Sequence, residues 1–245
     1  MTDEQPMAEN ANSDPAELAR FSVLATDWWD PNGRMRSLHQ INPLRLDFID
    51  ECAGGIAGKT CLDVGCGGGL ASEGLAERGA RSVLGIDLGE DLLNIARLHA
   101  SGTDLKNLEY RLVEAGALAA EKPGEFELVT CLEVLEHVPD PAALVGALGQ
   151  LVAPGGQLVI ATLNRTAKAF ALAIVGAEYV LGMVPKGTHQ YEKFIRPSEL
   201  DQWARAAGLE LAGLRGLEYQ PLGGQFHLSD DVAVNYFAHY CRPAA

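Results

Sequence analysis

The chain has 245 residues, of which 47 % are hydrophobic and 21 % charged, so its composition excludes a collagen-like or wholly disordered protein. Its 33 acidic and 19 basic residues give a formal net charge of −14. A basic surface supplies most of the affinity for a phosphate backbone, so we predict no nucleic-acid partner. The length favours one domain with appendages.

The cysteines and the N-terminus both point to the cytoplasm. Five cysteines form no Cys-x-x-Cys pair, which fits neither a disulfide framework nor a zinc site. Residues 1–13 are acidic and contain no arginine and no apolar run. We therefore expect a disordered tail there, with neither a secretory signal nor a transit peptide.

An N-terminal helical appendage is predicted over residues 14–58. Asp14-Pro15-Ala16-Glu17 combines an N-cap, a proline at the first helical position and a capping-box glutamate, which predicts a helix to about Thr26. Turn residues follow at 28–33. A second helix is predicted from Pro43 to Cys52.

From Thr60 onward, short apolar runs alternate with segments of helical periodicity. This βαβ alternation predicts a doubly wound α/β domain over residues 59–245, with a mostly parallel, seven-stranded sheet. Residues 164–196 are treated as an insertion. The predicted strands are 60–64, 82–86, 108–112, 128–132, 157–163, 209–219 and 232–240, and the helices are 71–78, 91–100, 141–152 and 198–207.

A glycine-rich turn follows the first predicted strand. Gly65 and Gly67 begin a stretch in which backbone can approach a ligand closely, and Asp87 at the end of the second strand can accept both ribose hydroxyls. The turn has Leu70 where a dinucleotide motif needs glycine, which disfavours NAD, and no Lys-Ser/Thr follows, which excludes a P-loop. Asp63 is available to orient a cationic or amino-acid group. The spacing predicts a nucleoside-type cofactor.

These residues resemble the class I methyltransferases, which have a Rossmann-like fold and bind S-adenosyl-L-methionine. Further segments resemble the ubiquinone biosynthesis O-methyltransferase family, from Leu18 to Tyr240. The glycine turn is generic to class I enzymes, whereas the Trp-Trp and Pro-Lys-Gly-Thr-His segments are far more specific. The resembling segments are Asp27-Trp28-Trp29-Asp30 and residues 38–45, 133–141, 162–165, 175–179 and 184–189.

The resemblance implies which residues contact the methyl donor. Arg45 would bind the methionine carboxylate, a task that suits its two-pronged guanidinium. Leu132 would lie against the adenine, and the methionine that the family often has there offers a similar apolar surface. With the residues of the glycine turn included, the predicted cofactor-binding residues are Arg45, Asp63, Gly65, Gly67, Asp87 and Leu132.

The phenol hydroxyl that would accept the methyl group is mostly protonated at neutral pH. A phenol with a pKa near 10 is only about one part in a thousand ionised at pH 7. Glu133, Glu136 and His137 follow the fourth strand, at the edge where open α/β sheets bind ligands. They could hold a divalent cation, and the resemblance implies Mg²⁺ in some members; alternatively His137 alone is the catalytic base, or the motif only shapes the loop.

The insertion contains an apolar segment, Ala169 to Val184, with a single charge. As a helix it would span about 24 Å, short of the roughly 30 Å hydrocarbon core, so we predict that it does not cross a membrane. Cations outnumber acids around it, which predicts contact with a membrane surface through residues 165–186. The alternative is a buried helix.

The resemblance implies an O-methyltransferase acting on polyprenylated phenols or quinols of ubiquinone synthesis, namely 2-polyprenyl-6-hydroxyphenol, 3-demethylubiquinol or both. Such an enzyme would be cytoplasmic, peripheral on the inner face of the cell membrane, and a partner in a ubiquinone-synthesis complex. The alternatives are a methyltransferase of another small molecule, a nicotinamide-dependent oxidoreductase, and a cofactor-binding scaffold without catalysis.

Overall fold

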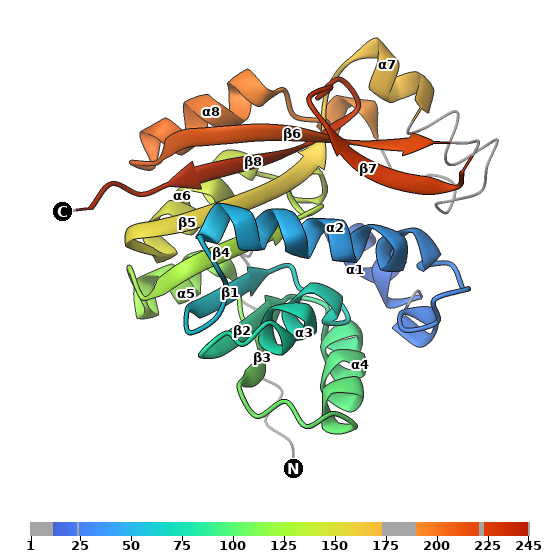
Figure 1. The fold of residues 1–245 in the computed structure, drawn as a ribbon, viewed down its shortest axis with the longest axis vertical. Coiled ribbons are helices and arrows are strands. Elements are labelled where there is room, and N and C mark those ends of the chain that lie inside the picture. Colours follow the sequence, from blue (N-terminus) through green and yellow to red (C-terminus); the bar gives the residue numbers. More distant parts are fainter. Residues whose placement is uncertain (1–11, 24, 173–189, 221–222, 245) are drawn as a thin grey trace.

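The computed structural model describes residues 12–23, 25–172, 190–220 and 223–244. Its centre is an 8-stranded sheet of order β3-β2-β1-β4-β5-β8-β6-β7 (Figure 1). The first five strands pair in parallel, and β8, β6 and β7 continue the sheet in antiparallel pairs. The strands are β1 Thr60–Val64, β2 Ser82–Asp87, β3 Leu108–Leu112, β4 Phe126–Leu132, β5 Val152–Leu163, β6 Glu210–Gln220, β7 Gln225–Ser229 and β8 Asn235–Cys241.

Helices cover both faces of the sheet, which confirms the predicted doubly wound α/β class. One large buried cluster joins α2 and α3 to the sheet, and another large cluster joins α5, α6 and α8 to the opposite face. The α-helices are α1 Pro15–Ser22, α2 Arg36–Ala53, α3 Leu70–Glu77, α4 Glu90–Ser101, α5 Ala115–Glu121, α6 Pro141–Leu151, α7 Ala167–Ala169 and α8 Pro197–Ala206. The short 3-10 helices are η1 Ala25–Asp27, η2 Leu135–His137 and η4 Tyr191–Lys193.

The predicted count of seven strands is wrong by one. β7 pairs with β6 through a hairpin, in register from Gln220 opposite Gln225 to Gly216 opposite Ser229. None of the residues of β7 is buried, so no buried apolar run marks the strand, but Gly223 and Gly224 between two alternating runs were a usable hairpin signal. The hairpin projects beyond the parallel half of the sheet, at the same end as α1 (Figure 1).

The first helix begins where the sequence predicts it. The Asp14 carboxylate accepts a hydrogen bond from the Ala16 amide at 2.9 Å, and proline occupies the first turn. The helix ends at Ser22, before the predicted Thr26, and the chain then enters the 3-10 turn η1.

The second helix is longer than predicted, since it begins at Arg36 and contains Pro43. The prediction started it at the proline because proline favours a first helical turn. Burial of Ile41 and Leu46 against the sheet, on either side of Pro43, outweighs the hydrogen bond that the proline cannot make. Figure 1 shows α2 lying across one face of the sheet.

Only the two ends of the insertion belong to the described residues. Residues 173–189, with most of the apolar segment Ala169 to Val184, lie outside them, so the predicted buried or membrane-surface helix is not described. No helix within the described residues is long and apolar enough to cross a membrane. Phe170 and Leu172, at the start of the segment, are 46 % and 51 % exposed.

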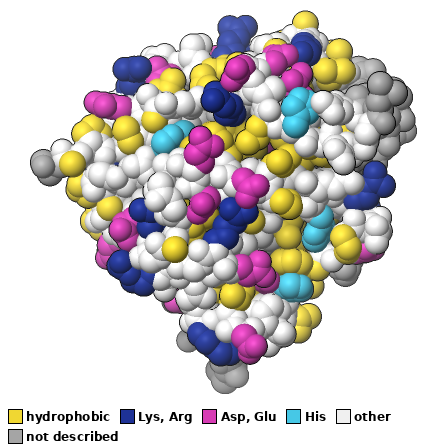
Figure 2. Space-filling view, in the orientation of Figure 1, with side chains coloured by type: hydrophobic (Ala, Val, Ile, Leu, Met, Phe, Trp, Pro, Cys, Tyr) yellow, Lys and Arg dark blue, Asp and Glu magenta, His cyan; other side chains and the backbone are white. Residues whose placement is uncertain are grey.

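Charges of both signs cover the face of the molecule drawn in Figure 2. Acidic and basic side chains alternate there with exposed apolar groups, and no continuous basic field covers this face. Some surface ion pairs join neighbouring elements, such as Arg111 of β3 with Glu121 of α5 at 2.9 Å, and others lie within one helix, such as Arg205 with Asp201 of α8.

The packing of α2 yields the first prediction. Ile49 is fully buried between α2 and the sheet, so Ile49→Ala leaves a cavity and should lower the free energy of unfolding by about 2–5 kcal/mol. Urea denaturation measures the change. Leu98→Ala, at a side chain on α4 that is 69 % exposed, is the control, and we expect a shift within about 0.5 kcal/mol. An equal decrease in the free energy of unfolding of both variants would contradict the conclusion that burial of Ile49 holds α2 on the sheet.

Candidate active site

The glycine turn after β1 is held against the end of β2. The amides of Gly65 and Cys66 both donate to the carbonyl of Ile86, at 2.8 and 3.0 Å. Gly65 has φ of +70°, and a Cβ there would come within 2.3 Å of the Val134 side chain. Glycine is therefore required at this position both by conformation and by space.

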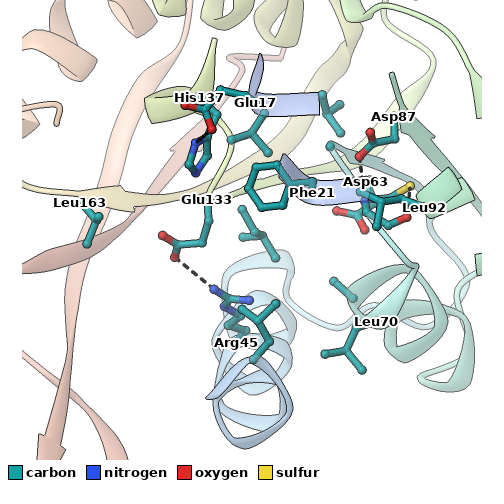
Figure 3. Close-up of a pocket in the computed structure, with 18 of the residues that line it drawn as sticks. Glu17, Phe21, Arg45, Asp63, Leu70, Asp87, Leu92, Glu133, His137 and Leu163 are labelled. Carbon is teal, nitrogen blue, oxygen red and sulfur yellow. Dashed lines mark hydrogen bonds and ion pairs between the residues drawn. The ribbon is translucent and has the colours of Figure 1, made fainter. Parts of the chain in front are cut away.

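Asp87 is fixed at the end of β2 by two backbone amides. Its carboxylate accepts from Gly67 at 2.8 Å and from Gly89 at 2.7 Å. Burial raises the pKa of this carboxyl above its ordinary value, although the amide hydrogen bonds oppose the shift. Each oxygen keeps acceptor capacity that a ribose hydroxyl can use. Figure 3 shows the carboxylate beside the pocket.

Asp63 lies deeper, inside the strand end, and is 2 % exposed. Its carboxylate accepts from the hydroxyl of Ser72 at 2.6 Å and from that of Thr130 at 2.8 Å. Burial raises the pKa of Asp63. The side chain thus ties β1 to α3 and β4 while it lines the same cavity.

A cavity of about 590 Å³ opens at the carboxyl ends of β1, β2 and β4, where open α/β sheets bind their ligands. The structure brings all of the predicted cofactor-binding residues to its wall, together with Glu133 and His137. Those predicted cofactor-binding residues are Arg45, Asp63, Gly65, Gly67, Asp87 and Leu132.

Arg45 enters the cavity from α2. Its side chain is 6 % exposed, and its guanidinium donates to the carboxylate of Glu133 at 3.1 Å (Figure 3). Glu133 has φ of +56°, a left-handed conformation that is uncommon outside glycine. This turn of the backbone directs the carboxylate toward α2, so the pair joins the N-terminal helices to the end of β4.

His137 contacts the first helix. Its Nδ1 lies 3.3 Å from Oε2 of Glu17, and the ring of Phe21 meets the imidazole edge-on at a centroid distance of 5.1 Å. Glu17 is 5 % exposed, and it also pairs with Arg20 at 3.2 Å and Lys193 at 3.3 Å. The sequence predicted Glu17 only as part of a helix cap.

Glu136 turns away from the cavity and is 3 % exposed. It accepts from the Thr162 hydroxyl at 2.8 Å, and burial, reinforced by the nearby Glu133 carboxylate, raises its pKa well above the ordinary value. Glu133 faces Arg45 and His137 faces Glu17. The Glu136 carboxyl thus lies beside that of Glu133, whereas His137 meets Glu17, and the described part of the chain holds no group of three such side chains arranged for a metal ion.

The far side of the cavity comes from elements that the sequence did not assign to the site. Leu217 and Tyr219 on β6 and Phe226 on β7 line it opposite the strand ends, with Phe21 of α1 and Asn235 of β8. These residues are distant in the sequence and belong to no motif of their own, so only the hairpin glycines hinted at them. The apolar wall suits an aromatic or aliphatic ligand.

Comparison with known proteins now identifies the family. Residues 19–213 match the family described as "Methyltransferase domain". A ubiquinone biosynthesis O-methyltransferase of Leptothrix cholodnii is 57 % identical over 94 % of this chain and 97 % of its own length. The Acinetobacter baylyi protein of that name is 54 % identical over 93 % and 95 %. The chain belongs to the ubiquinone biosynthesis O-methyltransferase family.

Solved structures agree on the fold. Magnesium protoporphyrin IX methyltransferase from Synechocystis, with bound S-adenosylhomocysteine, has a TM-score of 0.60 at 18 % identity, covering 90 % of this chain and 99 % of its own. A SAM-dependent methyltransferase from Aquifex aeolicus has a TM-score of 0.55 at 17 % identity, covering 94 % and 98 %. The fold is that of class I methyltransferases, and family membership makes the chain an S-adenosylmethionine-dependent O-methyltransferase.

The second prediction tests the ribose site. Asp87→Ala removes the acceptor at the end of β2 and should weaken binding of S-adenosylhomocysteine at least about tenfold, because hydrogen bonds to charged groups contribute about 1.5–3 kcal/mol. Isothermal titration calorimetry measures the affinity. Asp91→Ala, at an exposed position on the neighbouring helix α4, should bind normally. Unchanged affinity of the Asp87 variant would reject the ribose role.

Proposed function

We propose that this enzyme methylates a phenol or catechol hydroxyl of polyprenylated ubiquinone precursors: 2-polyprenyl-6-hydroxyphenol, 3-demethylubiquinol or both. The names of its relatives support the pathway. The observation that carries the proposal is the position of His137, in the wall of a cavity that also holds the predicted methyl-donor residues and an apolar face.

The acceptor side of the cavity has the chemistry of such a substrate. Leu163, Leu217, Phe226 and Val234 line it, so an aromatic ring and the first prenyl units can bury apolar surface there. His137 is the titratable group next to this side that can take a proton near neutral pH. Such a base removes a proton from a phenol more readily than from an aliphatic alcohol, because the pKa of an alcohol hydroxyl is far higher.

His137 acts as the general base in this proposal. S-adenosyl-L-methionine, when bound, supplies a methyl group whose bond to sulfur breaks as the bond to the acceptor oxygen forms. His137 removes the hydroxyl proton, and the Glu17 carboxylate at Nδ1 favours the tautomer in which Nε2 accepts it. Glu17 also stabilises the imidazolium that results, because the pair is largely shielded from water.

Methyl transfer is tested with a short-tailed demethylated quinol and S-adenosyl-L-methionine. The enzyme should form the methyl ether, and His137→Gln should lower kcat by about 10²–10⁴-fold without changing the affinity for S-adenosylhomocysteine. Product is measured by mass spectrometry. Normal cofactor binding without transfer to any demethylated quinol would instead favour a scaffold.

A chelator separates the histidine base from the metal alternative. Since His137 contacts Glu17 and the described residues form no group of three side chains arranged for a metal ion, we expect full activity after treatment with EDTA. Activity that disappears in chelator and returns with Mg²⁺ would overturn the base mechanism and restore the metal ligand set.

The proposal includes a place of action at the inner face of the cell membrane, through residues 165–186, and in a ubiquinone-synthesis complex. The support is the exposure of Phe170 and Leu172 beside Lys168, whose side chain is 47 % exposed and forms an ion pair with Asp231. Apolar groups flanked by cations bind anionic lipid surfaces.

Sedimentation with anionic liposomes tests the membrane contact. The double variant Phe170→Ser, Leu172→Ser should sediment less than the parent protein, because two apolar side chains no longer enter the lipid interface. Leu98→Ser, an exposed leucine on α4, is the matched control and should sediment normally. Equal sedimentation of all three proteins would reject this contact surface.

A further inference from the structure

Three buried polar atoms in the cavity wall have no hydrogen-bond partner in the described part of the chain. They are Nε1 of Trp28, Oδ1 of Asn42 and Nε of Arg45. The three residues are 7 %, 8 % and 5 % exposed, and all line the cavity. Buried polar atoms in folded proteins are nearly always paired, so three orphans around one cavity indicate a polar ligand.

Asn42 and Arg45 present their unpaired atoms from one face of α2. Residues three apart in a helix are neighbours on its surface. The Asn42 amide nitrogen donates to the carbonyl of Leu70 at 3.1 Å. Because a carbonyl only accepts, this bond fixes the orientation of the amide and leaves Oδ1 as the unpaired acceptor.

Trp28 lies directly on the glycine turn. A Cβ at Gly67 would come within 2.6 Å of the indole ring, and one at Gly68 within 2.3 Å. The segment is anchored on both sides, since the Trp28 carbonyl contacts Nε2 of His39 at 2.8 Å and Trp29 donates to the Gly68 carbonyl at 3.0 Å. The unpaired indole N–H is therefore held in place at the same turn.

The three unpaired atoms are one hydrogen-bond acceptor, Oδ1 of Asn42, and two donors, Nε1 of Trp28 and Nε of the cationic Arg45. An α-amino acid group carries the complementary set, because its ammonium only donates and its carboxylate only accepts. We propose that Trp28 and Asn42, with Arg45, bind the amino-acid end of the methyl donor. Oδ1 of Asn42 accepts from the ammonium, while the indole N–H and Nε of Arg45 donate to the carboxylate.

The inference rests on the placement of the donor proposed above, with its ribose at Asp87. Arg45 can serve the carboxylate while it is paired with Glu133, because that pair uses a terminal nitrogen and leaves Nε unused. The amino-acid end and the ribose then attach to different elements, α2 and the end of β2.

Two ligands separate this role from a general effect on the site. S-adenosylhomocysteine contains the amino-acid end, and 5′-methylthioadenosine lacks it but keeps the ribose and adenine. We expect two variants to bind S-adenosylhomocysteine at least about tenfold more weakly. One is Trp28→Phe, which removes the indole N–H and keeps an aromatic ring, and the other is Asn42→Leu. Both variants should bind 5′-methylthioadenosine as the parent does, by calorimetry.

Matched controls and a second measurement complete the test. The control variants Trp203→Phe on α8 and Asn94→Leu on α4 should bind both ligands normally. Asp87→Ala should lower the affinity for both ligands, and so checks the placement of the donor's ribose independently. In the unsubstituted protein, the ¹⁵N resonance of the Trp28 indole should shift with S-adenosylhomocysteine and not with 5′-methylthioadenosine. Unchanged affinity in both variants, equal losses for the two ligands, or an indole signal that responds equally to both would overturn the inference.

Discussion

The hydrogen bond from the Gly67 amide to the Asp87 carboxylate, 2.8 Å long, joins the turn after β1 to the end of β2. The rest of the site is arranged around this contact. This hydrogen bond requires the glycine turn to lie close to neighbouring side chains: Val134 fills the space beside Gly65, and Trp28 fills the space beside Gly67. A side chain at either glycine would push the turn away from β2 and separate the carboxylate from the cavity.

The N-terminal helices complete what the strand ends begin. α2 is bound to the sheet by the burial of Ile49 and its neighbours, so the position of Arg45 is set by apolar packing on the same helix. α1 contributes Glu17, whose carboxylate meets His137 from η2 and Lys193 from η4. The surroundings of His137 and the position of Arg45 therefore depend on helices that precede the sheet in the sequence.

The electrostatics of the cavity suit a cationic ligand. Burial raises the pKa of Asp63 and Asp87 at its wall, and that of Glu136 behind it, because each negative charge is costly away from water. Arg45 alone supplies a buried positive charge among the described cavity residues. A sulfonium brought into this environment is attracted by the carboxylates, while the neutral thioether left after transfer is not.

The sequence by itself determined the features that depend on neighbouring residues. It located most of the strands and helices, the glycine turn, and Asp87 at the end of β2, because periodicity, caps and turn geometry are local properties. Family motifs added Arg45 and Leu132 to the same cavity. The strand β7 was missed because it pairs with β6 at the edge of the sheet and none of its residues is buried, so no buried apolar run marks it.

Only the tertiary structure decided which distant side chains meet. Glu17 and His137 are brought together by the docking of α1, and Arg45 reaches Glu133 because the backbone of Glu133 is left-handed. The same packing turned Glu136 toward Thr162 and His137 toward Glu17, although the two residues are adjacent in the sequence. Spacing along the chain cannot reveal such outcomes, because the direction of a side chain is set by the elements that pack against it.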